Sequence, residues 1–570
     1  MRWNLTGICA VCWVLSQQSV AAESALDAYL ADCDRRFSEE HAMLGTSFTS
    51  PGYHTTVPDG TWVHPTRQSL DYALALLQRR AGTDAQRAAR IVEKVLSLQD
   101  TDVNSRTYGI WPWVLEEPLS RMSPPDWNWA DFCGARLAMI LHDSAAILPQ
   151  PLLQNIKSGL GHAAQAIRKR NVRPDYTNIA IMGGGVCAAA GELLPDDVLL
   201  AYGRERLQGV VDFAARNGGF QEYNSPTYTM VALYETERTL HLVRDEATRA
   251  AAESLRQRAW ETISVSFHPG TQQWAGPHAR SYSDYLFASV AEYLTQQTGT
   301  RIVPHPSEAG NRMRLAEILP HLPCPESYRE AFQDSRDDLR ETRRTFLRGQ
   351  SEDDSLVGIT CVTGDACLGT INRGSFWTQQ RPVIAYWRTG DDPAVVFRIR
   401  FFHDGRDFAS MAVRTSQQQM RALVLVHALR NAGDWHPTLD RPRDGIFLAE
   451  DLRLRFELRG KGVRVESMGE HRFALVAGER RAVIHPLPGR FADADVAWVP
   501  GSDQDCAFVD AVCYHGAKRE FDFRSPLQME LGGGIELLLR DEPITEVRPS
   551  WARESLGEAI WTSLRCRGQR

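Results

Sequence analysis

The spacing of apolar residues changes once along this 570-residue chain, near residue 340. Before that point apolar residues recur every three to four positions, which predicts helices. The predicted helical segments are residues 70–77, 91–98, 137–148, 152–167, 199–213, 230–243, 255–267 and 285–294. After it, short alternating runs separated by turn residues predict an all-β sandwich. These runs are residues 356–362, 383–387, 394–402, 423–426, 474–477, 482–485 and 535–539.

The helical half is expected to form an incomplete α/α toroid. Frequent glycines and prolines divide it into about a dozen helices with short connections. A helical solenoid is the alternative, but the sequence shows no repeat of fixed period. The predicted fold is therefore α+β and multidomain, with a toroid over residues 23–340 and an antiparallel β-sandwich over residues 341–570.

The first 22 residues read as a secretory signal peptide. Arg2 is followed by a mostly apolar stretch over residues 5–15, and residues 19–22 suit cleavage near Ala22. The apolar stretch is too short to cross a bilayer. We therefore expect a periplasmic or secreted protein without membrane insertion.

Charge and cysteine content narrow the choice of ligands. A net charge of −7 gives no sign of nucleic-acid binding, so an acidic ligand would have to meet a local basic cluster. Outside the predicted signal peptide no CxxC pair and no zinc-ligand spacing occurs, which predicts neither a metal nor another cofactor. Two cysteine pairs are candidate disulfides across neighbouring strands: Cys361 with Cys367, and Cys506 with Cys513.

One polar, aromatic stretch over residues 218–228 interrupts the helical pattern after two glycines. Ser225 followed by Pro226 predicts a helix N-cap with proline at the first helical position. The positive end of that helix favours anions. This stretch is either a capped surface turn or the rim of a binding site, and we favour the site, formed by Glu222, Tyr223, Asn224 and Tyr228.

A second stretch, residues 108–132, is rich in tryptophan and contains Trp127, Asn128 and Trp129. Exposed aromatic rings beside hydrogen-bonding groups suit a sugar, whose C–H face stacks and whose hydroxyls bond. A tryptophan-rich core at helix ends is the alternative.

A third stretch contains Asn178, and three consecutive glycines over residues 183–185 follow it within a helical pattern. Three glycines cost a helix about 2–3 kcal/mol relative to alanine. A second helix or a ligand is therefore expected to approach at backbone distance.

The fourth stretch begins at Trp274 and continues through Gly276-Pro277 to His278, Arg280 and Tyr282. A single histidine is usually structural. A histidine, an arginine and a tyrosine at alternate positions after a Gly-Pro turn favour a functional site.

Together these features resemble polysaccharide lyases of the heparinase II/III and alginate lyase type, which have an incomplete α/α toroid followed by an antiparallel β-sandwich. Asn178, in Tyr-Thr-Asn-Ile, resembles their carboxylate-neutralising asparagine, and Tyr228 resembles their catalytic tyrosine. Residues 368–372 and 377–382, which include Gln379 and Arg381, resemble the sandwich segment beside their cleft. The resemblance implies an acidic polysaccharide substrate.

The chemistry of such a lyase is consistent with these residues. β-Elimination removes the C5 proton of a uronic acid, and Asn178, His278 and Arg280 could neutralise the neighbouring carboxylate. A tyrosine with a pKa near 10 is too weak a base at neutral pH unless a cation or a helix N-terminus lowers that pKa. Tyr228 is expected to lie in the first turn of its helix, where the helix N-terminus would lower its pKa. The sequence leaves open which of Tyr228, His278 and Tyr282 is the base and which is the acid.

Two other functions stay open. An inverting glycoside hydrolase on a similar toroid would need two carboxylates, for which Glu222 with Asp131 or Asp284 are candidates. A non-catalytic glycan-binding protein would need only the tryptophans.

Overall fold

The computed structural model describes residues 25–51, 53–308, 315, 319, 321–333, 338–351, 353–429, 445–469, 472–524, 528–544, 549–556 and 559–566. The predicted signal peptide lies outside these residues. None of the described helices is long and apolar enough to cross a membrane.

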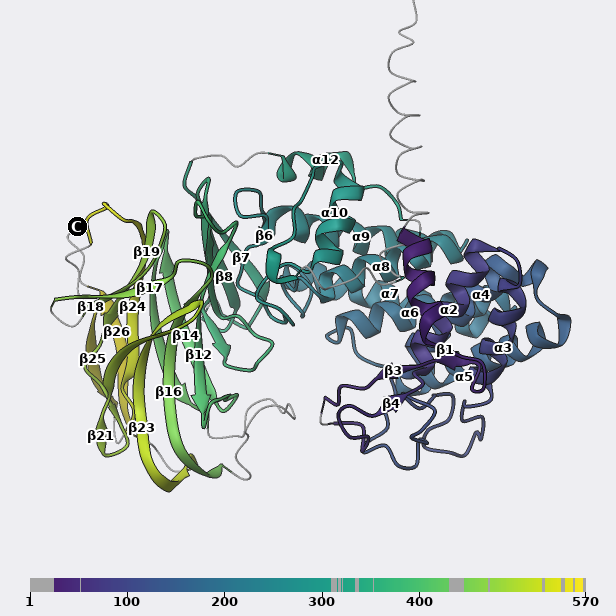
Figure 1. The fold of residues 1–570 in the computed structure, drawn as a ribbon, viewed down its shortest axis with the longest axis horizontal. Helices are drawn as coiled ribbons and strands as arrows, with labels where there is room; N and C mark the ends of the chain where they lie inside the picture. Colours follow the sequence, from purple (N-terminus) through teal and green to yellow (C-terminus); the bar gives the residue numbers. More distant parts are fainter. Residues whose placement is uncertain are drawn as a thin grey trace, which may run out of the picture.

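The N-terminal domain consists of antiparallel helix pairs (Figure 1). A first helix covers residues 25–36. The others are α2 (Thr66–Arg79), α3 (Asp84–Leu96), α4 (Trp129–Ser144), α5 (Gln150–Arg170), α6 (Thr177–Leu193), α7 (Asp197–Asn217), α8 (Tyr228–Leu242), α9 (Glu246–Ser266), α10 (Ala288–Thr298) and α12 (Glu326–Arg329), with short 3-10 turns. Every segment predicted to be helical is a helix or overlaps one.

The pairs form an incomplete α/α toroid, as the sequence predicts. Helices α2, α4, α6 and α8 contact one another in series, and α3, α5, α7 and α9 form a second series beside them. The first series is the inner one, because α6 is buried on every face from Thr177 to Gly191. The inner helices are parallel, so the N-terminal ends of α4, α6 and α8 lie at one end of the domain.

The glycines of α6 are explained by helix packing. A Cβ on Gly185 would lie 2.2 Å from the Thr239 hydroxyl of α8, and one on Gly183 would lie 2.4 Å from Asp131 Oδ1 of α4. On α7, a Cβ on Gly203 would lie 2.4 Å from the backbone nitrogen of Ala188 in α6. Of the two explanations considered for the glycines, close helix approach is the one observed.

The C-terminal domain is an antiparallel β-sandwich of two large sheets (Figure 1). One sheet has the order β10-β14-β15-β24-β19-β18-β17, and the other has the order β22-β23-β16-β12-β11-β9-β8-β7. Their bounds are β7 (Arg340–Leu347), β8 (Leu356–Val362), β9 (Ala366–Ile371), β10 (Arg373–Ser375), β11 (Val383–Trp387), β12 (Val395–His403), β14 (Met411–Gln418), β15 (Arg421–Ala428), β16 (Ile446–Arg459), β17 (Arg464–Met468), β18 (Arg472–Ala477), β19 (Arg480–Pro486), β22 (Ala497–Asp503), β23 (Cys506–Asp522) and β24 (Leu531–Leu539).

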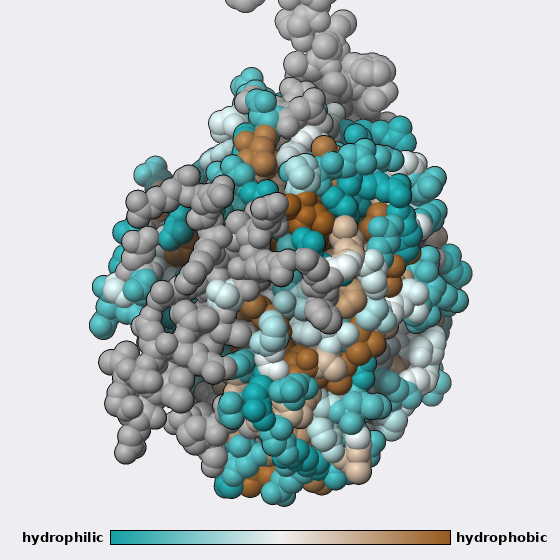
Figure 2. All heavy atoms as spheres, turned by 90° about the vertical axis from the view of Figure 1, so that its left-hand side faces the viewer, coloured by the Kyte–Doolittle hydropathy of each residue, from teal (hydrophilic) through white to brown (hydrophobic). Residues whose placement is uncertain are grey.

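Apolar side chains from the facing sides of the two sheets form one core, which includes Trp387, Phe397 and Phe456. The end of the sandwich turned away from the helices shows a surface of mixed hydrophilic and hydrophobic residues (Figure 2). A further short strand, β13 (Arg406–Asp407), pairs with β12 in the second sheet. The remaining strands pair as two-stranded ribbons: β1 (Phe37–Ser38), β2 (Met43–Leu44), β3 (Thr46–Ser47), β4 (Trp62–Val63), β5 (Phe267–His268), β6 (Gln273–Trp274), β20 (Arg490–Phe491), β21 (Ala494–Asp495), β25 (Pro549–Leu556) and β26 (Ala559–Cys566).

The two candidate disulfides are wrong, because all four cysteines are free thiols. Cys367 lies opposite Val362 in the register of β8 and β9, so Cys361 and Cys367 point to opposite sides of the sheet. Cys361 packs in the sandwich core, and Cys367 packs toward the helical domain. Cys506 and Cys513 belong to one strand, β23, and not to neighbouring strands.

The domains meet where residues 275–281 lie along the sandwich. His278 and Arg381 exchange both backbone hydrogen bonds, and Ser281 N donates to Gln379 O. Backbone also approaches backbone at Gly369, where a Cβ would lie 2.0 Å from the carbonyl oxygen of Gly276. This loop of the helical domain therefore extends the edge of the sandwich like a short strand.

Candidate active site at the domain junction

The stretch over residues 218–228 joins α7 to α8 and reaches the junction. Gly218 ends α7 with a φ of 89°, where a Cβ would also lie 2.5 Å from Thr345 O of the sandwich. The Ser225 hydroxyl accepts from Tyr228 N at 2.9 Å, but α8 begins at Tyr228 with Thr227 at its N-cap, so the predicted cap at Ser225 with Pro226 as the first helical residue is wrong by two positions. The same hydroxyl donates to Arg280 O at 2.6 Å, so it also ties this loop to residues 275–281.

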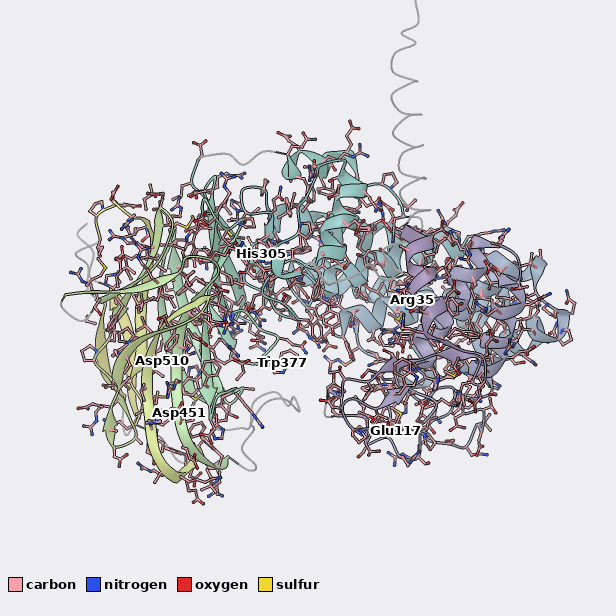
Figure 3. All side chains as sticks on the ribbon, in the orientation of Figure 1. Arg35, Glu117, His305, Trp377, Asp451 and Asp510 are labelled. Atoms are coloured by element: carbon pink, nitrogen blue, oxygen red, sulfur yellow. The ribbon has the colours of Figure 1, made fainter. Side chains whose placement is uncertain are left out.

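Arg280 is the centre of the site. Its guanidinium pairs with Glu222 at 3.0 Å and donates to Gln379 Oε1 at 2.9 Å. Its central carbon lies 4.3 Å from the centre of the Tyr228 ring and 5.1 Å from that of Trp377. One side chain thus joins both domains, and Trp377 lies between them (Figure 3).

Tyr228 and Tyr282 form a hydroxyl pair with 2.8 Å between the oxygens. Tyr282 is about half exposed, at 52%. Burial raises the pKa of Tyr228 far above its ordinary value, and Arg280 offsets only part of that rise. The expected lowering of this pKa is therefore wrong in its net sign, because the partial burial of the phenol outweighs the effect of Arg280.

Asn178 is the second residue of α6 and is buried. Its backbone nitrogen donates to Glu222 at 3.2 Å, so the Glu222 carboxylate lies at the positive end of α6. Its side-chain oxygen accepts from Ile179 N at 2.9 Å, while its Nδ2 donates to none of the described residues. Burial raises the pKa of Glu222, and the neighbouring Arg280 offsets only part of that rise.

Glu222 and Arg280 border a cavity of about 540 Å³ between the domains, and Asn178, Tyr228 and Tyr282 lie behind or beside these two residues and not in its lining. The helical domain contributes Tyr176, Glu222 and Arg280 to its wall, and the sandwich contributes Arg373, Trp377 and Gln380 among others. Its cations and aromatic rings suit an acidic sugar better than an apolar ligand.

His278 lies away from the tyrosine pair, in the junction itself. It is buried, its Nε2 lies 3.0 Å from Trp274 O, and its Nδ1 has no partner among the described residues. Burial lowers its pKa to about 4, and Arg381 adds to that effect. The ring is therefore neutral at pH 7, and none of its described contacts is with Tyr228, Tyr282 or Arg280.

Arg381 and Asp284 belong to a buried ion cluster in the same junction. Asp284 Oδ1 accepts from Arg381 and from Arg398, each at 2.6 Å, and Arg398 also pairs with Glu457 at 2.7 Å. Although burial raises the pKa of Asp284, the two guanidinium groups outweigh it and hold that pKa far below the ordinary range. Arg381 therefore neutralises a carboxylate of the protein and does not line the cavity.

Four of the predicted substrate-binding residues have close partners within the protein. Trp274 is buried and donates to Asn224 Oδ1 at 2.6 Å, while the Asn224 amide donates to two backbone carbonyls. Tyr223 stacks on Phe346 with 4.5 Å between ring centres and also lines the cavity. Gln379 is buried and faces Arg280.

The tryptophan-rich stretch lies along the same end of the toroid. Asn128 accepts from Arg170 at 2.7 Å and donates to the Tyr176 hydroxyl at 3.4 Å, which places it next to the cavity wall. Trp127 donates to Arg106 O, and Trp129 donates to the Thr66 hydroxyl. Both rings are partly buried against the toroid core.

Three residues that line the cavity have no role in the sequence-based assignment: Tyr176, Arg373 and Trp377. Tyr176 immediately precedes α6, and Trp377 begins the segment 377–382 that the resemblance points to, so both lie in stretches that the sequence singles out. No pattern around Arg373 indicates its position.

The carboxylates proposed for a hydrolase are separated. Glu222 lines the cavity, whereas Asp284 lies in the ion cluster. Asp131 is buried in α4 against Gly183, and burial raises its pKa to about 7.

Comparisons with known proteins give a family match to the helical domain. The family described as Domain of unknown function (DUF8769) matches residues 37–313. No curated protein matches the chain.

Solved structures similar to the chain include two heparinases. A mutant heparan sulfate lyase from Pedobacter heparinus is 10% identical, with 96% of this chain and 94% of that chain covered and a TM-score of 0.38. A heparinase III with methylated lysines is 10% identical, with 99% and 98% covered and a TM-score of 0.34. An endoglucanase from Clostridium thermocellum complexed with cellotriose is 9% identical, with 84% and 83% covered and a TM-score of 0.18. At this similarity, the activity of this chain has to be argued from its own site.

Proposed function

We propose that this chain is a polysaccharide lyase that cleaves a uronic-acid-containing polysaccharide by β-elimination. The observation that carries the proposal is the position of Arg280. This cation lies over the Tyr228 ring, beside Glu222, at the wall of a cavity shared by both domains. A cation beside a phenol is the pair of groups that proton removal next to a carboxylate requires.

The substrate carboxylate would be neutralised by Arg280 and by the Asn178 amide. The C5–H bond breaks and its electron pair forms the C4–C5 double bond, while the C4–O bond breaks and the leaving oxygen takes up a proton. Negative charge develops at the carboxylate during this step, so donors fixed in advance lower the barrier. The positive end of α6 adds to the same effect.

Tyr228 is the proposed base, and its hydroxyl partner Tyr282 is the proposed route for the proton. The hydroxyl of Tyr282 can donate to a Tyr228 phenolate across their 2.8 Å separation. Because burial raises the pKa of Tyr228, only a small fraction is phenolate at pH 7. The protonated phenol formed after proton removal can in turn protonate the leaving oxygen.

His278 has no proton-transfer role in this proposal. It is neutral and buried, and its described contacts hold the junction together. The cavity wall formed by Tyr176, Arg373 and Trp377 would bind sugar units next to the cleaved bond.

The test is absorbance near 235 nm during incubation with a panel of uronate polymers, because only elimination forms the conjugated double bond. The Tyr228→Phe substitution should lower the rate by about a thousandfold or more, equivalent to a barrier increase of about 4 kcal/mol. Tyr328→Phe is the matched control, because Tyr328 lies in α12, outside the site. Full activity of Tyr228→Phe would refute the assignment.

The same experiment separates the other two functions. Reducing ends released without absorbance near 235 nm would indicate a hydrolase. Glycan binding that is equal in Tyr228→Phe and the unmodified protein, without cleavage of any polymer, would indicate a binding protein.

A further inference from the structure

A second cluster of chemically reactive side chains lies at the opposite end of the inner helices. His142 and Asp143 are in the last turn of α4, and His241 is in the last turn of α8. His142 Nδ1 and His241 Nε2 lie 2.6 Å and 2.9 Å from the same oxygen, Asp143 Oδ1. One ligand atom from each of the three side chains lies within 4.8 Å of the others.

We propose that His142, Asp143 and His241 bind one divalent transition-metal ion of the zinc type, which clamps the C-terminal ends of α4 and α8 together. Two imidazoles and one carboxylate are ligands that zinc accepts, and such a site leaves a further position for water. The site is separate from the proposed lyase site and does not depend on that function.

The distances require little movement. Ligand atoms at about 2.0–2.2 Å from a tetrahedral zinc ion lie about 3.3 Å apart. The two nitrogen–oxygen separations of 2.6 Å and 2.9 Å would therefore open by about 0.7 Å and about 0.4 Å, and the two nitrogens, which lie within 4.8 Å of each other, would close to the same spacing. All three side chains are accessible, with exposed fractions of 29% for His142, 31% for Asp143 and 51% for His241.

The local field favours a cation. The carbonyl ends of α4 and α8 both point to this cluster, and the C-terminal end of a helix carries partial negative charge. Asp143 and His241 line a cavity of about 350 Å³, and two arginines, Arg80 and Arg238, line it as well. Both are engaged, because Arg80 donates to the Asp143 and Leu77 carbonyls and Arg238 pairs with Glu235. The cavity gives water access to the open position of the ion.

Metal binding here would stabilise the toroid and not take part in chemistry. Helices α4 and α8 are each about 15 residues long, so the cluster lies roughly 20 Å along them from Asn128 and Tyr228. An ion that joins their far ends restrains the spacing of the helices whose near ends border the lyase site.

The test is zinc titration of the full chain after chelator treatment, followed by calorimetry and thermal unfolding. We expect one equivalent of Zn²⁺ and a higher Tm with metal. Asp143→Asn and His241→Gln should each weaken binding at least tenfold, with the Tm of the metal-free protein nearly unchanged. His515→Gln is the control, since this exposed imidazole forms a single carboxylate pair with Asp451 on the sandwich and should leave binding unchanged.

A measurement on the unmodified chain guards against variants that fail to fold. Co²⁺ should bind with a visible absorption band that one equivalent of Zn²⁺ displaces. Absence of saturable uptake of either ion, or uptake that survives both Asp143→Asn and His241→Gln, would overturn the proposal.

Discussion

Replacement of Asp284 by asparagine should destabilise the protein by about 3 kcal/mol. The carboxylate is 17% exposed and is shared by Arg381 and Arg398, whose side chains are 8% and 11% exposed. Removing one partner of a buried ion pair costs about 3–5 kcal/mol, because the remaining charge stays buried without compensation. Arg398 keeps Glu457 as a partner, so the lower end of that range applies.

Urea-induced unfolding followed by tryptophan fluorescence would measure this difference. The control is Glu466→Gln, which removes a surface pair with Arg464 whose two side chains are each 42% exposed. Such pairs contribute at most about 1 kcal/mol. Equal stability of the two variants would show that the buried cluster does not hold the junction.

The same substitution has a predicted pH signature. The pKa of Asp284 is depressed in the folded protein, so its contribution is present above its unfolded value of about 3.9 and is lost as the pH falls below it. Below about pH 4 the unmodified protein should therefore lose stability more steeply than Asp284→Asn. Parallel stability curves for the two proteins in acid would contradict this reasoning.

Three further predictions follow from other residues. Burial raises the pKa of Asp131 to about 7, so Asp131→Asn should be neutral near pH 4 and stabilising by up to about 4 kcal/mol at pH 8, which thermal unfolding at both pH values would check. Gly203→Ala should destabilise the protein by about 1–3 kcal/mol, because its Cβ would overlap the backbone of α6. Gly209→Ala on the same helix should stabilise it by about 0.5–1 kcal/mol, since the nearest neighbour of its Cβ would be 3.6 Å away. Urea unfolding should show changes of opposite sign in the free energy of unfolding for the two variants. If Tyr228 phenolate is the base, the lyase rate should rise about tenfold per pH unit from pH 7 to 9, and a flat profile at 235 nm would exclude that role.

Periodicity identified the elements well because each domain has a large buried core. The run over residues 383–387 is β11, and the run over residues 356–362 is β8. The bond from the Tyr228 backbone to the Ser225 hydroxyl was predictable because it is local, although the helix begins two residues later than predicted. The glycines of α6 also signalled a close neighbour, although only the fold shows that the neighbour is another helix.

Properties that depend on distant neighbours were not predictable. Cys361 and Cys367 are close in sequence, but strand register decides which face each occupies. His278 and Arg280 alternate in one loop, yet one points into the junction and the other toward the cavity. The pKa of Tyr228 depends on burial beneath residues that lie 52 and 54 positions further along the chain.

The strand-like pairing of His278 with Arg381 has a consequence for dissecting the chain. Residues 275–281 belong to the first half by sequence but complete the edge of the second half by hydrogen bonding. A fragment cut near residue 340 would retain Tyr228 and Arg280, but the loop that carries Arg280 would lose its backbone hydrogen bonds to Gln379 and Arg381. Neither half would then possess the intact cavity, so the proposed site requires both halves together.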